Sequence, residues 1–406
     1  MTTTKNNGHK KLNVPNLRFP EFQGEWEKCK LSEICTFFSG GTPSSSNKDF
    51  YGGNIAFIRS GELHADSTEL FITQAGFDSS SAKMVEVGDL LLAMYGATSG
   101  DIAVSKIKGA INQAILCIRT KQNKKFIESV WNKHVSKNLR KYLQGGQGNL
   151  SADIVKGISF SFPTLKEQEK IANFVSLLDE RIATQSKIID KLQSLIKGLE
   201  DNLLDNPLWK KTYLRSFMQF FSTNSLSWEQ LSYEEGEIRN LHYGLIHGFL
   251  TRGINSASLP MIKNEARPKQ YTLCQVGDVA FADASEDTGE IAKSVEFVDT
   301  IEGDTICGLH TIHGRDIKNR TVVGFKGFAF NSRYFHNQIK RLAQGTKVFS
   351  ITANNLSSCY VYLPDLETQK AIVNLLKTYE AKLLVSKRLL EHYEKQKQYL
   401  LRQMFI

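Results

Sequence analysis

The chain of 406 residues repeats itself after about half its length. Pro163 and Gln168 recur 201 positions later as Pro364 and Gln369, and in each copy a helical stretch follows whose apolar residues keep the same phase. A duplication of this kind predicts two similar modules and two similar helices related by an approximate two-fold axis. Such a geometry suits a partner that is itself two-fold, such as double-stranded DNA.

Both helical stretches show the spacing of a coiled coil. Their apolar residues recur alternately four and three positions apart, the pattern of a seam between packed helices. The seam comprises Ile171, Val175, Leu178, Ile182, Gln185, Ile189 and Leu192 in the first helix, and Ile372, Leu376, Tyr379, Leu383, Ser386, Leu390 and Tyr393 in the second. A polar residue interrupts each seam at the same place, so antiparallel pairing would bring Gln185 against Ser386 and fix the register. We therefore expect an antiparallel coiled coil.

The starts and the outer faces of these helices are also marked. Thr164, with Glu167 three residues later, and Asp365 stand where side chains cap the first free N–H groups of a helix. The apolar residues outside the seam include Leu195, Leu204, Leu375, Leu384 and Leu389. This is more apolar surface than one partner helix covers, so we expect a further face that docks another protein.

The remainder of each copy predicts a module of mixed strands and helices. A loop rich in glycine and serine, residues 39–48, is flanked by short β-type runs. The matched strings are Val87-Gly88-Asp89 with Val276-Gly277-Asp278, and Gly100-Asp101-Ile102-Ala103 with Gly289-Glu290-Ile291-Ala292, both 189 positions apart. The equal offset predicts two hairpins of equal length with different tips. A helix with a basic pair, Arg140-Lys141 or Lys340-Arg341, closes each module before a Gln-Gly stop.

These patterns predict an α+β chain in which two similar globular domains are joined by two long helices, with an internal pseudo-two-fold axis. The expected organisation is a flexible N-terminal tail over residues 1–15, a first domain over 16–163, a coiled-coil helix over 164–204, a second domain over 205–363 and a coiled-coil helix over 364–406.

Composition narrows the function without identifying it. The net charge of +9 favours a polyanionic partner. The six cysteines are scattered without a Cys-x-x-Cys pair, so neither a disulfide framework nor a zinc knuckle is expected. The start of the chain is polar and the longest apolar run, residues 90–94, is short, which predicts a cytoplasmic protein outside the membrane.

Motifs for catalysis and metal binding are missing from the sequence. Asn206-Pro207-Leu208-Trp209 lacks the second proline of an adenine methyltransferase turn and follows a helix, so we interpret it as a linker. No phosphate-binding loop for ATP is present. His310 and His313, like His242 and His247, lack cysteine or carboxylate partners at ligand spacing, which favours structural or DNA-contacting roles over a metal site. We expect no catalytic residue and no metal.

Several short strings together resemble the specificity subunit of type I restriction-modification systems. They are Pro15-Asn16-Leu17-Arg18-Phe19-Pro20-Glu21-Phe22 with Trp26, the Gly41-Thr42-Pro43 loop leading to Gly52-Gly53-Asn54-Ile55, the paired Val-Gly-Asp anchors, Asn240-Leu241-His242-Tyr243-Gly244, and the Pro-x-x-x-x-Gln lead into both helices. Their order, doubled and combined with the coiled coil, covers nearly the whole chain.

The resemblance implies a non-catalytic subunit that binds double-stranded DNA. Two target recognition domains would each read one half of an asymmetric split site, and the coiled coil would set their spacing and dock two methyltransferase subunits. Restriction/translocase subunits would join this core. The resemblance also implies that this chain holds no cofactor, and that S-adenosylmethionine, ATP and Mg belong to the partner subunits.

Candidate DNA contacts are polar residues of the loops and basic residues of the closing helices, because base edges are read by hydrogen bonds and phosphates by cations. In the first domain they are Ser44, Ser46, Lys48, Arg59, Tyr95, Thr98, Ser99, Arg140, Lys141, Gln147 and Asn149. In the second they are Tyr243, His247, Arg252, Ser285, Arg333, Lys340, Arg341 and Lys347. The acidic tip, residues 283–287, predicts that the second half-site differs from the first.

Two alternatives stay open at this point. One is a self-contained DNA adenine methyltransferase, which binding of S-adenosylmethionine by the isolated chain would favour. The other is a coiled-coil scaffold that does not bind DNA, which the absence of a salt-dependent gel shift on duplex DNA would favour.

Overall fold

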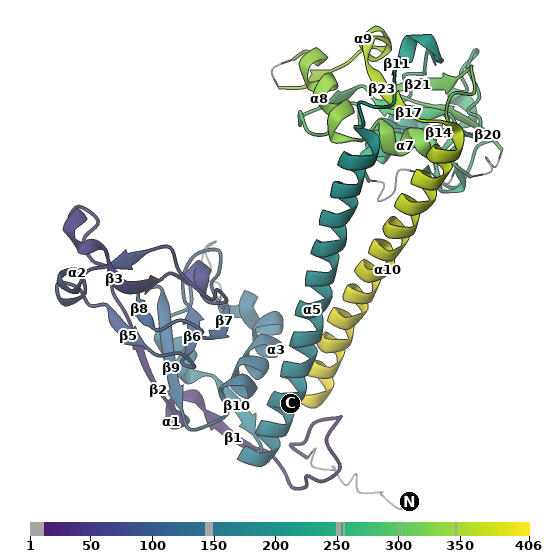
Figure 1. The fold of residues 1–406 in the computed structure, drawn as a ribbon. Helices are drawn as coiled ribbons and strands as arrows, with labels where there is room; N and C mark the ends of the chain where they lie inside the picture. The colour runs from purple at the N-terminus through teal and green to yellow at the C-terminus, as the bar shows by residue number, and fades with distance from the viewer. Residues whose placement is uncertain are drawn as a thin grey trace, which may run out of the picture. The chain divides into compact units, whose positions relative to one another are not determined.

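The computed structural model describes residues 12–142, 149–248, 253–254, 256–299, 301, 303–345 and 347–406, and for residues 135–142 the backbone alone. The chain divides into two compact units. Unit 1 comprises Met1–Ser186 and Leu389–Ile406, and unit 2 comprises Lys187–Arg388. Each unit is a mixture of helices and sheets, as the sequence predicts (Figure 1). The long helices α5 (Leu165–Leu204) and α10 (Leu366–Met404) belong partly to each unit.

Unit 1 contains two four-stranded sheets and one two-stranded sheet. The antiparallel first sheet has the order β2 (Cys35–Ser39), β9 (Ile115–Thr120), β6 (Leu90–Ala93) and β7 (Ile102–Val104). The second has the order β4 (Phe71–Ile72), β3 (Tyr51–Ile58), β8 (Gly109–Ile111) and β5 (Lys83–Val85), with β3 and β8 parallel. Strand β1 (Glu27–Lys30) pairs with β10 (Ser159–Phe162). The shorter helices are α1 (Leu31–Ile34), η1 (Lys48–Phe50), η2 (Ser60–Glu62), α2 (Gln74–Asp78), α3 (Lys124–Tyr142) and α4 (Ala152–Gly157).

Unit 2 is built on a similar set of sheets. Its five-stranded sheet has the order β12 (Met218–Phe221), β21 (Thr311–Asp316), β17 (Val279–Ala282), β19 (Ser294–Phe297) and β15 (Gly253–Ile254). Its four-stranded sheet has the order β13 (Leu231–Ser232), β16 (Met261–Ile262), β14 (Ile238–Leu241) and β20 (Asp304–Cys307). The two-stranded pairs are β11 (Lys210–Tyr213) with β23 (Tyr360–Leu363) and β18 (Ala284–Ser285) with β22 (Phe349–Ser350). The shorter helices are η3 (Leu214–Ser216), η4 (Trp228–Gln230), α6 (Tyr243–Gly248), η5 (Ser256–Ser258), η6 (Asn264–Ala266), α7 (Phe325–Ala329), α8 (Arg333–Leu342) and α9 (Ala353–Ser358).

The sequence repeat is therefore also a repeat of topology. The order β12-β21-β17-β19 reproduces β2-β9-β6-β7, and the pair β11-β23 reproduces β1-β10. In both copies the last strand of the pair leads directly into a long helix. Among the described residues no helix is long and apolar enough to cross a membrane.

The predicted equal length of the two hairpins is wrong. Leu92 faces Ile102 across β6 and β7, whereas Phe281 faces Ser294 across β17 and β19. The first members of these pairs are 189 positions apart and the second members 192, so the hairpin of unit 2 is three residues longer. The matching string ends at Ala292, whose positive φ of 57° places it in a turn before β19 rather than in the strand.

The Pro-x-x-x-x-Gln motif attaches each long helix to its unit. Gln168 is buried, accepts a hydrogen bond from the backbone N–H of Asn123 at 3.1 Å and donates to the carbonyl of Pro163 at 2.9 Å. Gln369 is also buried, accepts from the N–H of Val322 at 3.0 Å and donates to the carbonyl of Pro364 at 3.0 Å. A buried amide that satisfies backbone groups of a loop and of its own helix start fixes one against the other. The motif is thus explained by packing.

The two long helices pair in the antiparallel sense. In unit 1 the start of α5, at Ile171, shares a core with Met404 at the end of α10. In unit 2 the end of α5, at Leu204, shares a core with Ile372 and Leu376 at the start of α10. Each unit by itself therefore shows one end of the predicted antiparallel arrangement. Every predicted seam position is buried or half-buried.

The predicted outer-face position of Leu204 is wrong, and the predicted contact between Gln185 and Ser386 stays open. Leu204 lies in the core of unit 2 and does not belong to a free outer face, because the helix ends there against the module. Leu195 and Leu375 are exposed, as expected of an outer face. Gln185 is buried and Ser386 is half-buried, and their meeting stays a prediction.

The start of α10 is capped as predicted, and the start of α5 differs in part. Asp365 accepts a hydrogen bond from the N–H of Thr368 at 2.9 Å. Thr164 accepts only a long bond of 3.5 Å from the N–H of Glu167. The Glu167 carboxylate does not turn back to the cap. It is buried and accepts from Arg18 at 2.7 Å and from the indole N–H of Trp26 at 3.3 Å, so it holds the opening segment of the chain against α5.

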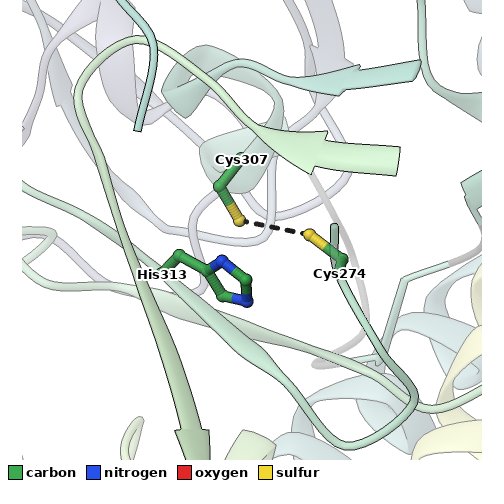
Figure 2. A group of neighbouring side chains, drawn as sticks. All are labelled: Cys274, Cys307 and His313. Carbon is green, nitrogen blue, oxygen red and sulfur yellow. Dashed lines mark hydrogen bonds between the residues drawn. The ribbon is translucent and has the colours of Figure 1, made fainter. Parts of the chain in front are cut away.

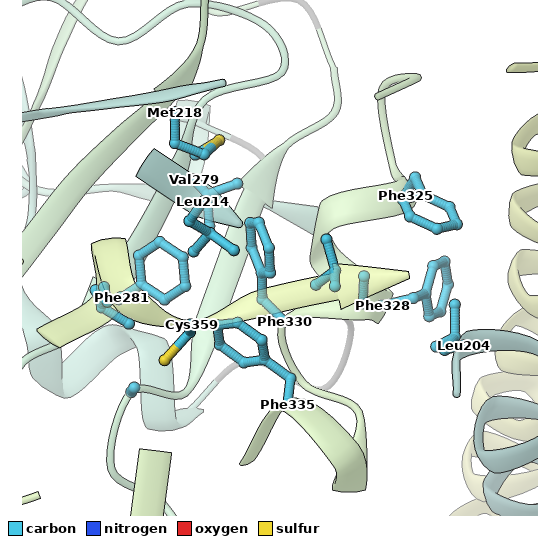
Figure 3. Close-up of a cluster of buried hydrophobic side chains, with 14 of the residues drawn as sticks. Leu204, Leu214, Met218, Val279, Phe281, Phe325, Phe328, Phe330, Phe335 and Cys359 are labelled. Carbon is cyan, nitrogen blue, oxygen red and sulfur yellow. The ribbon is translucent and has the colours of Figure 1, made fainter. Parts of the chain in front are cut away.

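Each unit has its own apolar core. In unit 2 the aromatic rings of Phe281, Phe330 and Phe335 pack against one another at tilted angles, as Figure 3 shows. In unit 1 the core contains Trp26 and Phe126. The strands packed on these cores position the loops of each unit.

Candidate nucleic-acid interface

Three loops of unit 1 are joined by backbone hydrogen bonds at the end of the β6–β7 hairpin. The N–H of Met94 donates to the carbonyl of Ala114 at 2.8 Å, and the N–H of Leu150 donates to the carbonyl of Met94 at 2.8 Å. These bonds bring together the hairpin tip, the turn before β9 and the segment before α4. We call this arrangement the loop frame of unit 1.

Unit 2 repeats the loop frame bond for bond. The N–H of Asp283 donates to the carbonyl of His310 at 3.0 Å, and the N–H of Ile351 donates to the carbonyl of Asp283 at 3.0 Å. Asp283 stands 189 positions after Met94, and Ile351 stands 201 positions after Leu150. Because backbone groups make these bonds, the frame does not depend on particular side chains at its positions.

The side chains on the two loop frames differ in chemistry. The frame of unit 1 displays Tyr95, 40% exposed, and the exposed amides of Gln113 and Asn149. Gln113 is bonded to the Thr42 hydroxyl at 2.5 Å, which ties the Gly/Ser loop to the frame. These groups are neutral donors and acceptors of the kind that read base edges.

The frame of unit 2 displays ionisable and aromatic groups instead. His310 contacts the Asp283 carboxylate through Nδ1 at 3.0 Å, and the ring of Tyr243 stands edge-on to His310 with 5.3 Å between centroids. His247 meets the Glu290 carboxylate at 3.3 Å, and that carboxylate also binds Lys293 at 3.0 Å. Burial would raise the pKa of Glu290, but Lys293 and His247 outweigh it and hold this pKa below its usual value.

The Val-Gly-Asp anchors form the turn that leads into each hairpin. Gly88 and Gly277 both have φ of 90°, which a residue with a Cβ rarely adopts. Asp89 accepts from the N–H of Glu86 at 3.0 Å and from Arg119 at 2.7 Å. Burial alone would raise the pKa of Asp89, but the hydrogen bonds from Arg119 and Glu86 lower it below its usual value.

In unit 2 the corresponding pair is Asp278 and Arg315, 2.7 Å apart. Asp278 also accepts from the N–H of Gln275 at 2.8 Å, just as Asp89 accepts from Glu86. Burial would raise the pKa of Asp278, and the bonds from Arg315 and His313 lower it below its usual value. The anchors are therefore structural in both units and support the loop frames from below.

The structure places the sequence-predicted contacts of unit 1 in different surroundings. Ser44, Ser46, Lys48, Tyr95 and Asn149 are exposed, and Thr98 is half-buried. Arg59 is held by Glu62 at 2.7 Å. Ser99 donates to the carbonyl of Met94 at 3.0 Å and so shapes the tip. Gln147 and the side chains of Arg140 and Lys141 lie outside the described residues.

In unit 2, Tyr243, His247 and Ser285 are half-buried at or beside the loop frame. Arg333 is exposed and lines a hollow whose other charged residues are of both signs, Lys197, Glu200, Asp201, Glu290 and Lys293. Lys340, Arg341 and Lys347 are exposed, and Arg252 lies outside the described residues. Contact of any of these side chains with DNA stays a prediction.

Sequence reasoning missed Gln113 and His310 as members of the loop frames, and Thr42 as the partner of Gln113. One feature of the sequence could have indicated them. The residues of the turn before β9 differ from those of the corresponding turn before β21, whereas the strands on either side occur in both copies. It also missed that Cys274, Cys307 and His313, scattered along the sequence, come together in the interior of unit 2 (Figure 2). His310 and His313 do not share a site, because their rings face different carboxylates.

The linker assigned to Asn206-Pro207-Leu208-Trp209 is a tight turn between α5 and β11. The side chain of Asn206 accepts from the N–H of Leu208 at 3.0 Å, and its carbonyl accepts from the N–H of Trp209 at 3.0 Å. The side chain of Asn206 thus stabilises the turn, and Leu208 is 91% exposed. This geometry is that of a connection.

Comparisons with known proteins agree with the repeated architecture. The MjaVIII specificity subunit of a type I restriction enzyme from Methanocaldococcus jannaschii is 22% identical over 404 positions, covering 94% of this chain and 91% of that protein. The putative MjaX specificity subunit from the same organism is 24% identical over 423 positions, covering 96% and 95%. The crystal structure of a type I restriction-modification S subunit from M. genitalium has the same fold, with a TM-score of 0.58 at 15% identity and coverage of 97% and 99%.

The family model described as the type I restriction modification DNA specificity domain matches residues 23–194 and 308–394. These residues include the loop frame of unit 1, the turn before β9 and its counterpart in unit 2, and most of both long helices. Together they make up more than half of the chain, so this protein belongs to the family of type I restriction-modification specificity subunits, the non-catalytic components that recognise DNA.

Proposed function

We propose that this subunit binds double-stranded DNA sequence-specifically and that each unit reads one half of an asymmetric, split site. The observation that carries the proposal is the loop frame. Two identical sets of backbone hydrogen bonds present unlike side chains, neutral amides and a tyrosine in unit 1 and a histidine–carboxylate–tyrosine group in unit 2. A constant frame with variable side chains is what two readers of different sequences require, because base edges are distinguished by donor and acceptor pattern.

We also propose that the long helices set the distance between the half-sites and dock two methyltransferase subunits. Support comes from α5 and α10, which are 40 and 39 residues long and carry large exposed apolar residues. These residues are Leu177, Ile188, Leu195, Leu375, Val385 and Tyr399. Exposed apolar side chains on helices that already have a packed seam suit a further protein partner.

The proposed assembly assigns the chemistry to the partners. S-adenosylmethionine would be held by the methyltransferase subunits, and ATP and Mg by restriction/translocase subunits that join them. The complex would act in the cytoplasm. This chain would supply the choice of sequence and the spacing.

Substitutions on the two loop frames test the proposal. Tyr95→Ala with Asn149→Ala in unit 1, and Tyr243→Ala in unit 2, are each assembled with the methyltransferase subunits, and the methylated motif is read by sequencing genomic DNA. Each variant is expected to relax or abolish recognition in one half of the motif, a different half for each unit. Tyr233→Ala serves as the control, since Tyr233 is 63% exposed and lies outside the frames. Variants of both units that alter the same half would overturn the proposal.

A further inference from the structure

Three potential metal ligands meet in the interior of unit 2. Cys274 precedes β17, Cys307 ends β20 and His313 lies in β21, and all three are buried. The two sulfur atoms are 3.6 Å apart, and one ligand atom from each residue lies within 4.8 Å of the other two. Figure 2 shows the imidazole facing the two sulfur atoms. The ligands thus come from separate elements whose positions the sheets fix.

One ring nitrogen of His313 is hydrogen-bonded to a carboxylate, and the other has no hydrogen-bond partner. Nε2 lies 2.7 Å from Asp278 Oδ2, and Nδ1 is buried without a hydrogen-bond partner. Since Arg315 also binds Asp278, that carboxylate is charged and accepts the N–H of Nε2. The Nδ1 lone pair then remains unsatisfied. A histidine that donates one N–H to a carboxylate and offers its other nitrogen is the usual arrangement of a metal ligand.

Unit 1 shows that the scaffold does not need these residues. Ala280 faces His313 as Leu91 faces Cys117, and Leu273 bridges Ile306 as Met84 pairs with Ala110. The positions that correspond to Cys274, Cys307 and His313 are therefore Val85, Ile111 and Cys117. In unit 1 these three residues belong to one apolar cluster. The trio of unit 2 replaces apolar packing that suffices in the sister module.

We infer that Cys274, Cys307 and His313 bind a thiophilic cation of the zinc class. In a tetrahedral site with Zn–S bonds of about 2.3 Å, two sulfur ligands lie about 3.8 Å apart, close to the distance found here. Both cysteines are free, so each sulfur is available as a ligand. The proposed site differs from the expectation from sequence that the chain holds no metal, which stays a prediction.

The remaining coordination position is open to a small ligand. Cys307 and His313 line a hollow together with Thr223 and Asn224, so a water molecule can complete four-coordination. Both cysteines are free and buried, and the Cys307 sulfur lies 3.6 Å from that of Cys274, so two thiols face the proposed ion position. On binding, each thiol releases one proton to solvent and forms one metal–sulfur bond, with no change in oxidation state. The ion would join β20, β21 and the turn at Asp278 beneath the loop frame.

Cobalt and zinc uptake by the reduced full-length protein test the inference. Co²⁺ is expected to bind at one equivalent and to give a thiolate-to-metal charge-transfer band in the near ultraviolet, and Zn²⁺ is expected to remain at one equivalent after gel filtration. Cys274→Val with Cys307→Ile, the residues of unit 1, should remove both signals. Cys117→Val should retain them. His313→Cys should keep binding with a stronger charge-transfer band, because a third thiolate replaces imidazole.

A wild-type protein that retains no stoichiometric metal while its thiols titrate as reduced would overturn the inference, as would a double variant that binds equally well. A measurement on the unmodified protein covers the case of variants that fail to fold. Added Zn²⁺ is expected to slow alkylation of Cys274 and Cys307 at least tenfold in mild denaturant, without protecting Cys117, as peptide mass spectrometry would show. Equal protection of all three cysteines would contradict a site at this trio.

Discussion

Replacing the glutamine of either Pro-x-x-x-x-Gln motif should destabilise its own unit. Gln168 and Gln369 each make three hydrogen bonds to loop and helix-start groups, and both are almost fully buried. Leucine at either position fills the volume but leaves a backbone N–H and carbonyl groups unsatisfied. At about 1 kcal/mol for each lost bond, and more where a donor stays buried, the expected loss of unfolding free energy is about 3–4 kcal/mol.

For a unit of about 200 residues this loss corresponds to a fall in Tm of roughly 6–16 °C. Differential scanning calorimetry of Gln168→Leu and Gln369→Leu is the assay, with Gln396→Leu on the exposed face of α10 as the control. Similar losses are expected in both variants because each glutamine makes three bonds, two of which are duplicated, and the control should change by less than about 0.5 kcal/mol. A loss below about 1 kcal/mol in both variants would refute the role assigned to the motif.

Further expectations concern pH and spacing. Asp89→Asn should destabilise unit 1 by about 1–2 kcal/mol at neutral pH, a value reduced by the exposure of Arg119. Because the folded-state pKa of Asp89 is lowered, its contribution is fully present above the unfolded pKa of about 4 and is lost progressively as pH falls through the folded pKa. Urea unfolding at pH 7 and pH 3 should therefore show the variant and the wild type converging, and an undiminished difference at pH 3 would contradict this assignment. Inserting one heptad in both α5 and α10 lengthens each helix by about 10.5 Å, or roughly three base pairs of duplex. The gap in the methylated motif should widen or binding should be lost. An unchanged gap would show that the helices do not set the distance between the half-sites.

The features of the fold that depend on local periodicity could be predicted from sequence. The seams of α5 and α10 repeat over their full length because helix pairing demands apolar residues at fixed spacing. The cap at Asp365 is equally local. The role of Glu167 could not be predicted, because its partners Arg18 and Trp26 lie about 150 residues away.

The candidate site could be predicted from the sequence only in part, for a similar reason. Its frame is made by backbone bonds between loops, such as Met94 with Ala114, and backbone groups leave no trace in residue identity. The matched string that begins at Gly289 gave the wrong hairpin length, because these residues lie in the turn of the second hairpin, which is longer than the first. The buried trio of Cys274, Cys307 and His313 is assembled from three elements with no ligand spacing in sequence.

Exchange of a whole module tests the central claim most directly. Residues 205–363 are replaced by the corresponding module of a relative that recognises another sequence, the hybrid is assembled with its methyltransferase subunits, and the methylated motif is read by genome sequencing. If each unit reads its own half-site, one half of the motif changes to that of the relative while the other half and the gap are retained. A motif altered in both halves, or in neither, would contradict the account.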